Sequence, residues 1–388
     1  MALRVGVVSE SAPGERRVAM VPGALTVLNK SAVEFLMQPG AGAQAGFPDN
    51  EYTEKGVRLA GREEVFQTAD VLLQVRSPGA NPDTGASDLA SMRRGQTVIG
   101  FGEPLTAIET ARGLAERGVT FLSMELMPRI TRAQSMDALS SMATIAGYKA
   151  VLLAADALPR MFPMLMTAAG TVAPARVLVI GAGVAGLQAI ATSRRLGAVV
   201  SGYDIRAVVK EQIESLGARF IVLNVEAQGA EDKGGYAKAM GEDFYRRQRE
   251  ALGDVLSEQN VVITTAAVPG RKAPVLITAE MSARMAPGSV IVDIAAERGG
   301  NCELTRPGEV VESNGVRIHG PVNLPSTIPY HASQMYAKNI ATFLKHLVKD
   351  GQLNLHRDDE IVRETLVTLN GEIVHPRVLE SMGALHAQ

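Results

Sequence analysis

The chain has 388 residues, of which 46% are hydrophobic and 21% charged, enough for two or three domains with buried cores. Its 39 Lys and Arg residues nearly balance 41 Asp and Glu residues, and the net charge of -2 argues against a nucleic-acid partner. The single cysteine, Cys302, excludes an internal disulfide, and the apolar runs fall short of the roughly 20 residues that span a membrane. We therefore expect a cytoplasmic globular protein.

The order of apolar patterns predicts an α/β fold. Glycine is abundant, with 38 residues, which suits many tight turns between strands and helices. Strand-like runs alternate with helical stretches at the spacing of βαβ units. In the first third these runs cover residues 3–8, 33–37, 71–75, 97–101 and 119–122; in a later domain they cover 175–180, 199–203, 220–223, 261–264 and 290–294.

Two long helical patterns separate these regions. From Ala133 to Ala157 apolar residues recur at three- and four-residue steps, and Thr131 with Gln134 forms a possible capping box at the start. We expect two Rossmann-like domains with parallel sheets, joined by long bridging helices. The expected boundaries are 1–132 plus 345–388 for the first domain, 133–160 and 328–348 for the helices, and 161–327 for the second domain, with a mobile loop at 224–252. Asn370-Gly371 in the tail predicts a tight hairpin.

The sharpest motif is Gly181-Ala-Gly183-Val-Ala-Gly186, which follows a predicted strand and opens a predicted helix. The first glycine permits the tight turn, the second lets the backbone approach a pyrophosphate, and the third lets helix and strand pack closely. A glycine-rich turn without a nucleotide is the alternative. The strand, the helix and the acid that follows favour dinucleotide binding.

That acid is Asp204, at the end of the next predicted strand, where a carboxylate can hold the ribose hydroxyls and repel a 2′-phosphate. This favours NAD over NADP. Arg206 keeps the alternative open, because a nearby guanidinium can receive a 2′-phosphate.

Several other sequence features give weaker evidence about function. A second glycine run, residues 40–46, precedes Pro48 and turn-forming residues, so we expect a structural loop without a phosphate-binding helix. Cys302 is interpreted as a buried thiol, with a nucleophile as the alternative. The cluster of residues 246–249 is interpreted as a solvated helix face. The six histidines lack zinc-ligand spacing, so no metal is expected.

Polar residues gather where the first domain ends and the long helix begins. From the residues alone, helix capping with an Arg129–Asp137 ion pair and contact with a ligand both remain open. The donors and acceptors there suit a nicotinamide carboxamide and its ribose. The polar and flanking residues of this stretch are Arg129, Ile130, Arg132, Gln134, Asp137 and Ser140.

Together with Gly14-Glu-Arg-Arg-Val-Ala19, Met166-Thr-Ala-Ala-Gly170 and the glycine motif, this stretch closely resembles the NAD(H)-binding component, domain I, of proton-translocating NAD(P) transhydrogenase. The resemblance covers essentially the whole chain. It implies a homodimer, a partner domain III that binds NADP(H) and a membrane-spanning domain II. It also implies a peripheral position on the inner face of the cytoplasmic membrane.

The resemblance also implies roles for single residues. Arg129, Gln134, Asp137 and Ser140 would position the nicotinamide, and Gln134, Asp137 and Arg129 would serve as the catalytic group. The residues implied to contact the adenosine half or to close over the nucleotide are Val184, Asp204, Ile205, Arg206, Gly235, Tyr236, Gln248 and Ala267.

The related alanine dehydrogenases supply the alternative function. They use an arginine, a lysine, a histidine and an aspartate at positions where this chain has Arg17, Gln74, no histidine in 97–104, and Glu297 before Gly299-Gly300. An amino-acid dehydrogenase must move a proton as well as a hydride, whereas transfer between two nicotinamides needs positioning only. The missing basic groups favour transhydrogenation. A nucleotide-sensing module without turnover is a third possibility.

Overall fold

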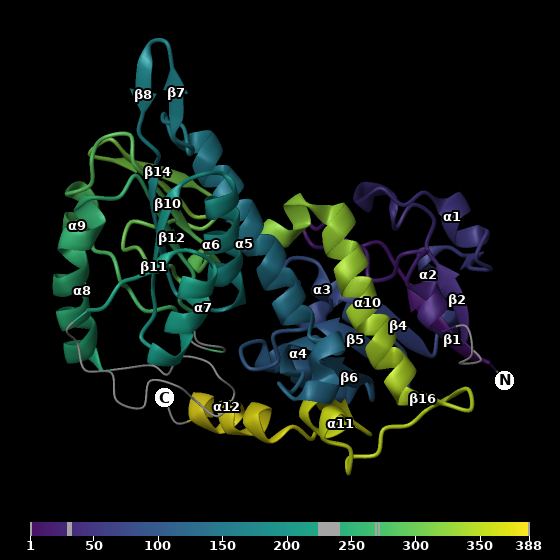
Figure 1. The fold of residues 1–388 in the computed structure, drawn as a ribbon. Helices are drawn as coiled ribbons and strands as arrows, with labels where there is room; N and C mark the ends of the chain where they lie inside the picture. Colours follow the sequence, from purple (N-terminus) through teal and green to yellow (C-terminus); the bar gives the residue numbers. More distant parts are fainter. Residues whose placement is uncertain (1, 29–32, 224–240, 268–269, 271, 387–388) are drawn as a thin grey trace. The chain divides into compact units, whose positions relative to one another are not determined.

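The computed structural model describes residues 2–28, 33–223, 241–267, 270 and 272–386. It divides into two compact units. Unit 1 comprises Met1–Met142 and Pro325–Gln388, and unit 2 comprises Ala143–Leu324. Unit 1 is thus made from two separate stretches of the chain, with unit 2 between them in sequence (Figure 1).

Unit 1 contains an eight-stranded sheet in the order β19-β18-β6-β5-β4-β1-β2-β3. The strands are β1 (Leu3–Val7), β2 (Val33–Met37), β3 (Arg58–Leu59), β4 (Val71–Arg76), β5 (Thr97–Phe101), β6 (Thr120–Ser123), β18 (Leu366–Leu369) and β19 (Glu372–Ile373). β1 to β6 are parallel, whereas β18 is antiparallel to β6 and to β19. Asn370 and Gly371, with φ of 53° and 92°, make the predicted tight turn.

Helices cover this sheet. They are α1 (Asp49–Thr53), α2 (Arg62–Thr68), α3 (Gly85–Ser91), α4 (Ile108–Glu116), α10 (Pro329–Leu347), α11 (Glu360–Thr365) and α12 (Pro376–His386). One core joins Phe66 of α2, Leu114 of α4 and Val378 of α12 to the sheet residues Leu72 and Val98. Outside the sheet, β16 (Val348–Lys349) and β17 (Gln352–Leu353) form a short hairpin after α10.

Unit 2 contains a seven-stranded sheet in the order β11-β10-β9-β12-β13-β15-β14. The strands are β9 (Arg176–Ile180), β10 (Val199–Tyr203), β11 (Arg219–Phe220), β12 (Val261–Thr264), β13 (Val290–Asp293), β14 (Val310–Ser313) and β15 (Val316–His319). All neighbours are parallel except β14 and β15. The strand order reverses between β9 and β12, and ligands of open α/β sheets bind at the carboxyl end of such a switch point.

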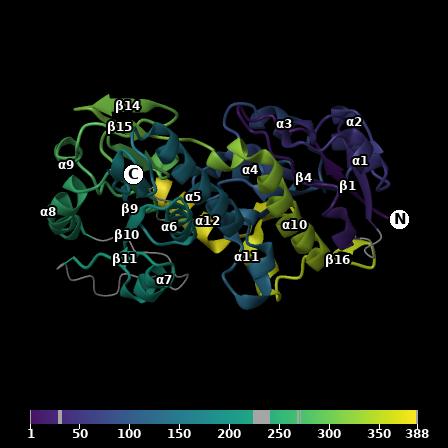
Figure 2. The ribbon, with the colours of Figure 1, turned by 45° about the horizontal axis from the view of Figure 1, so that its top comes forward.

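Alternating side chains of β9 build a core on each face of this sheet. Val177 and Val179 pack under α5 (Ala138–Ala157), α6 (Val184–Arg195) and α7 (Lys210–Ser215). Leu178 and Ile180 pack under α8 (Glu242–Ser257) and α9 (Ala279–Ala283). Figure 2 shows α8 and α9 on one side of the sheet and α5 and α6 on the other. The two mostly parallel α/β sheets confirm the predicted fold class.

A separate hairpin of β7 (Leu165–Thr167) and β8 (Gly170–Val172) projects from unit 2 (Figure 1). Every residue of both strands is exposed.

The helix α5 begins later than the periodicity predicts. Thr131–Met136 forms a 3-10 helix and α5 begins at Ala138, because Asp137 leaves the helical conformation with ψ of 88°. The carboxylate of Asp137 accepts the main-chain N–H of Ser140 at 2.9 Å, which caps α5. The predicted start at Ala133 and the predicted capping box are therefore wrong.

The apolar character of α5 reflects its packing. By length and composition α5 is the one described helix that could cross a membrane, and 44% of its apolar window is buried. Ala150, Val151 and Ala154 lie in the core of unit 2. Packing of this kind is typical of a central helix in a globular protein.

Candidate functional site

The three glycines of the motif differ in their surroundings, and each has a different structural role. Gly181 has φ of 95°, which any side chain would strain, and makes the turn after β9. A Cβ on Gly186 would lie 1.8 Å from the carbonyl oxygen of Gly181. Only a glycine at position 186 therefore allows α6 to pack against this turn. A Cβ on Gly183 would meet nothing within 4 Å. The backbone at Gly183 is therefore open to an approaching ligand.

The N-terminus of α6 lies at this open position. Gly183 is the N-cap, and in the described part of the chain no side chain caps the helix. Val184 at the first turn is 37% exposed. The unfilled backbone N–H groups and the helix dipole favour an anion, and the open backbone leaves room for one, so these residues fit the pyrophosphate of a dinucleotide.

Asp204, at the end of β10, is a hydrogen-bond hub beside the same turn. Its Oδ2 accepts the N–H of Ala182 at 2.7 Å and Nη2 of Arg206 at 2.8 Å. Its Oδ1 accepts the main-chain N–H and Nε of Arg206, each at 2.9 Å. The sequence predicts the acid and the arginine here, but not that they bind each other.

Two further predicted residues of unit 2 are described. Gln248 is buried on α8, and its Nε2 donates to the hydroxyl of Tyr203 at 2.9 Å, while its buried Oε1 has no partner among the described residues. Burial raises the pKa of Tyr203 to about 12, so this hydroxyl keeps its proton. Ala267 is exposed after β12, and Ile205 is half-buried after β10. Gly235 and Tyr236 lie outside the described residues.

The insertion is not a loop throughout. Residues 242–252, the last part of the predicted mobile loop, belong to α8, which begins at Glu242. Phe244, Leu252 and Leu256 recur at helical spacing and are buried, which explains why this half is helical. Residues 224–240 lie outside the described part of the chain.

Sequence reasoning missed a network that shapes the end of β12. The amide of Asn301 accepts the N–H of Ala266 at 3.0 Å and donates to the carbonyls of Ala266 and Pro274 at 2.8 and 2.9 Å. Buried Asp293 holds Asn301 in turn by accepting its N–H at 2.7 Å. The Gly299-Gly300 pair, with positive φ at both residues, is the local signal for this turn.

The polar junction residues lie in unit 1. Arg129 and Gln134 are exposed, and Ile130 is half-buried. Asp137 accepts both the N–H of Ser140 and its hydroxyl, the latter at 2.6 Å, so these two residues form the cap of α5. This outcome shows capping for Asp137 and leaves the side chain of Gln134 exposed to solvent.

Arg132 is also exposed, but its side chain forms an ion pair. Its Nη2 lies 2.8 Å from Oδ1 of Asp359, whose carboxylate also contacts Nε2 of His346 at 2.7 Å. Hydrogen bonds from Arg132, Ile361 and His346 hold the pKa of Asp359 below its usual value, although partial burial acts the other way. Arg132 is thus anchored to the start of α11.

Unit 1 also contains buried charge that sequence reasoning did not predict. The guanidinium of Arg17 is bound by both carboxylate oxygens of Glu15, at 2.7 and 2.6 Å, and both side chains are nearly inaccessible. Glu10 accepts the N–H groups of Val75 and Arg76 at 2.6 and 2.9 Å, at the carboxyl end of β4. Burial, and next the charge of Glu15, raises the pKa of Glu10 to about 8.

A second, partly buried acid lies at the carboxyl end of β5. One oxygen of Glu125 accepts the N–H groups of Gly102 and Glu103 at 2.5 and 2.6 Å, and the other is bonded to the hydroxyl of Ser123. Burial raises the pKa of Glu125 to about 7. The main-chain donors at this edge of the sheet are therefore satisfied by the chain's own carboxylates.

In the second glycine run, residues 40–46, a backbone N–H group is also bound by a carboxylate of the same chain. The predicted absence of a helix after Pro48 is wrong, because Asp49–Thr53 forms the short helix α1. The carboxylate of Asp49 accepts the N–H of Gly40 at 2.9 and 3.1 Å. A structural loop remains the interpretation that fits this region.

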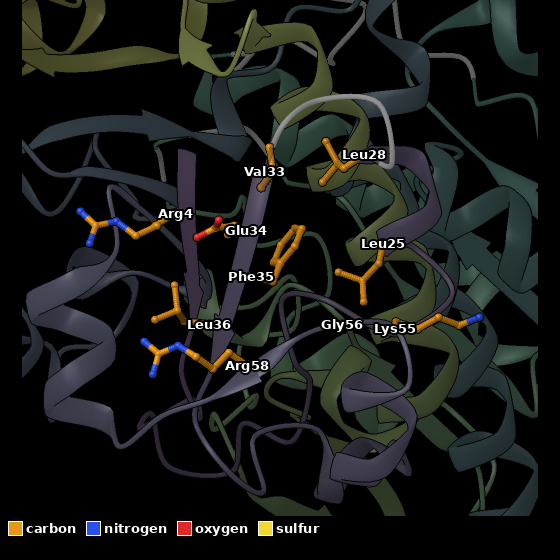
Figure 3. A pocket seen from close by; sticks show the side chains of 10 residues that line it. All are labelled: Arg4, Leu25, Leu28, Val33, Glu34, Phe35, Leu36, Lys55, Gly56 and Arg58. Carbon is orange, nitrogen blue, oxygen red and sulfur yellow. The ribbon is translucent and has the colours of Figure 1, made fainter. Parts of the chain in front are cut away.

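A pocket of about 540 Å³ lies at the edge of the unit 1 sheet around β2 (Figure 3). Its lining includes none of the predicted site residues. Two of its cationic side chains are paired, Arg4 with Asp70 at 3.4 Å and Arg58 with Glu64 at 2.7 Å. We assign no ligand to it.

In the described part of the chain, no group of three or more His, Cys, Asp and Glu side chains is arranged to hold a metal ion. Cys302 is buried, and burial raises the pKa of its thiol to about 11, which fits an inert buried thiol.

Comparison with known proteins gives concordant matches along the chain. Residues 6–146 match the N-terminal domain of alanine dehydrogenase/PNT and residues 150–376 match its C-terminal domain. An NAD(P) transhydrogenase alpha-subunit protein of Rhodospirillum rubrum is 46% identical over 386 residues, which cover 98% of this chain and 100% of that protein. NAD(P) transhydrogenase subunit alpha of Cereibacter sphaeroides is 43% identical over 99% of this chain and 73% of its own length. A crystal structure of transhydrogenase from Sinorhizobium meliloti is 44% identical, covers 96% of this chain and 100% of that one, and has a TM-score of 0.85.

Proposed function

The chain belongs to the alanine dehydrogenase/PNT family, and on that premise we propose that it is the NAD(H)-binding subunit of a proton-translocating NAD(P) transhydrogenase. In this proposal bound NADH supplies a hydride, which passes directly to NADP on a partner subunit, and proton translocation is coupled to that transfer elsewhere in the complex. The relatives are named as alpha subunits, which implies partner subunits for this chain as well.

The glycine turn after β9 is the observation that carries the proposal. Gly183 offers open backbone at the uncapped N-terminus of α6, and Asp204 lies beside it at the end of the next strand. An anionic pyrophosphate fits the first feature and a ribose fits the second.

The junction residues of unit 1 are proposed to position the nicotinamide. Gln134 and Arg129 are exposed, and their amide and guanidinium groups can donate to a carboxamide oxygen. Asp137 and Ser140 contribute by fixing the start of α5. None of these residues has to take up a proton, because a hydride moving between two nicotinamides requires alignment alone.

We also propose a homodimer, with domains II and III of the transhydrogenase as further partners and a peripheral position on the inner face of the membrane. The hairpin of β7 and β8 supports an interface between copies, because Met166 on it and the neighbouring Met164 are 78% and 56% exposed. An isolated two-stranded hairpin is marginal in water, and exposed apolar side chains are typical of a contact surface. The homodimer is tested by measuring the molar mass of the chain in solution at micromolar concentration.

The nucleotide site is tested by NADH fluorescence titration of the purified chain, which contains no tryptophan to interfere. Gly183→Val is expected to weaken NADH binding by about tenfold or more, because its side chain would fill the approach to the turn, while the thermal midpoint stays unchanged. Ala198→Val, a buried change outside the motif, is the control that alters packing without touching the turn. Unchanged NADH binding by Gly183→Val would contradict the proposal.

Transfer is tested with Gln134→Asn in a complex reconstituted with the NADP-binding partner. We expect little change in NADH affinity and a large loss of transfer rate, because shortening the side chain disturbs alignment more than binding. An unchanged rate would remove Gln134 from the proposed catalytic group. Binding of NADH without transfer by any loaded partner would instead indicate a nucleotide-sensing module.

The amino-acid dehydrogenase alternative is tested by absorbance at 340 nm with NAD and L-alanine. We expect no sustained rise. Arg17 is already bound by the carboxylate of Glu15, and Gln74 donates from Nε2 to Asp88 at 2.8 Å, so both groups that could face a substrate carboxylate are engaged within the chain. A sustained rise would overturn the transhydrogenase proposal.

A further inference from the structure

We propose that Arg206 decides which nicotinamide dinucleotide unit 2 accepts, and that Asp204 holds this arginine in the position that excludes a 2′-phosphate. The inference rests on the proposed NAD(H) function and deepens it. It concerns the choice between NAD(H) and NADP(H), for which the residue types alone leave both outcomes open.

The carboxylate of Asp204 is fully engaged. A carboxylate offers about four acceptor positions, and here they receive two main-chain N–H groups and two guanidinium N–H groups. The side chains of Asp204 and Arg206 are 5% and 12% exposed, so water competes little with the pair. A bidentate ion pair of this kind is shorter and stronger than a neutral hydrogen bond.

The main-chain bonds fix the carboxylate of Asp204 independently of the Arg206 guanidinium. Ala182, which belongs to the glycine turn, donates at 2.7 Å, and the N–H of Arg206 donates at 2.9 Å. Asp204 therefore keeps its position when the guanidinium leaves. Arg206 can leave because its guanidinium is at the end of a long side chain, which can turn the charged group away from Asp204.

A ribose 2′-hydroxyl and a 2′-phosphate meet this arrangement differently. A hydroxyl is a donor, so it can replace a guanidinium N–H on Asp204 and leave the carboxylate satisfied. A phosphate is an acceptor, so it needs the guanidinium for itself. Drawing Arg206 away would leave the nearly buried carboxylate of Asp204 without its counter-charge and beside a second anion.

The same geometry makes Arg206 a latent receptor for a 2′-phosphate. Asp204 suppresses this capacity by binding the guanidinium through Nε and Nη2, the two groups that also suit a phosphate. Removing the charge of Asp204 should therefore release the arginine. Selectivity then depends on the pair, and neither residue accounts for it alone.

The experiment measures binding of 2′,5′-ADP and of ADP, which probe the adenosine half without the nicotinamide. The proteins are the unmodified chain, Asp204→Asn, Arg206→Ala and the double variant. We expect Asp204→Asn to bind 2′,5′-ADP about tenfold or more tightly than the unmodified chain, because the freed guanidinium pairs with the phosphate. In the double variant this gain should disappear, and Arg206→Ala alone should show none.

The inference is overturned if Asp204→Asn gains no affinity for 2′,5′-ADP, or if the double variant retains the gain. Asp204→Ser serves as the second variant if Asp204→Asn unfolds, with the thermal midpoint as the check on folding. Failure of the unmodified chain to bind NADH is a separate outcome, because it overturns the proposed function and is read before any variant is compared.

Discussion

The two sheets of this protein treat the carboxyl ends of their parallel strands in opposite ways. In unit 1 the main-chain donors after β4 and β5 are filled by Glu10 and Glu125 of the same chain. In unit 2 the corresponding edge keeps open backbone at Gly183 and an uncapped helix. Backbone N–H groups at such an edge need a hydrogen-bond acceptor, and a protein can supply it from its own side chains or leave the position to a ligand.

This difference distinguishes a structural edge in unit 1 from a candidate binding edge in unit 2. Unit 1 carries acids that bind its own backbone, whereas unit 2 carries a glycine whose replacement should disturb a ligand. We therefore expect variants at the edge of the unit 1 sheet to change stability, and variants at the edge of the unit 2 sheet to change ligand binding.

The largest expected effect comes from Glu15→Ala. It removes the carboxylate that binds the buried Arg17 guanidinium and leaves that charge in the core of unit 1. Breaking such a pair from one side costs about 3–5 kcal/mol of unfolding free energy. Denaturant titration of the variant measures the loss.

The control for this change is the double variant Glu15→Leu with Arg17→Met, which removes both charges and keeps apolar volume. We expect it to recover most of the lost unfolding free energy. Equal losses in the single and double variants would show that the pair is not what holds this region together.

The next effect is the pH dependence that Glu125 contributes. Its pKa is raised from 4.5 to about 7, so between these values the folded chain holds a proton that the unfolded chain has released. The contribution to stability is therefore complete below pH 4.5 and is lost as the pH rises toward 7. The glutamine variant Glu125→Gln should be more stable than the parent above pH 7, by on the order of 3 kcal/mol, and should lose the advantage at pH 4.5.

Thermal unfolding of both proteins from pH 4.5 to pH 8 tests this. Glutamine keeps an oxygen for the N–H groups of Gly102 and Glu103 and cannot ionise. Parallel pH profiles for the two proteins would show that Glu125 does not titrate in this window.

The smallest effect concerns Gln248 in unit 2. Gln248→Leu removes the amide that donates to Tyr203, together with a buried oxygen that lacks a partner among the described residues. The lost bond and the relieved oxygen oppose each other, so we expect a stability loss of about 1 kcal/mol. Adding Tyr203→Phe should bring the loss close to zero, and a larger loss in the double variant would contradict this account.

The sequence predicts most of the fold because the signals for it are local. Apolar runs mark most strands of both sheets, although β3, β14 and β15 are not predicted, and Asn370-Gly371 marks the turn between β18 and β19. The glycine motif is local as well, since its three glycines and the strand before them lie within a dozen residues.

What the sequence does not predict depends on contacts between distant residues or on competition between neighbours. Asn301 reaches the backbone of Ala266, 35 residues away, and no local pattern marks that contact. At the start of α5 the periodicity extends back to Ala133, but the carboxylate of Asp137 captures the N–H of Ser140 and sets a later start. Side-chain capping here outweighs apolar spacing.

The antiparallel pairing of β18 with β6 has a consequence for synthesis on the ribosome. Leu366 pairs with Leu122, so the sheet of unit 1 gains this strand only after nearly the whole chain has been translated. All residues of unit 2, which end at Leu324, emerge earlier. Unit 2 can therefore fold while the first stretch of unit 1 still waits for its last strands, and during that interval the edge of β6 is a place where a nascent chain needs protection from wrong pairing.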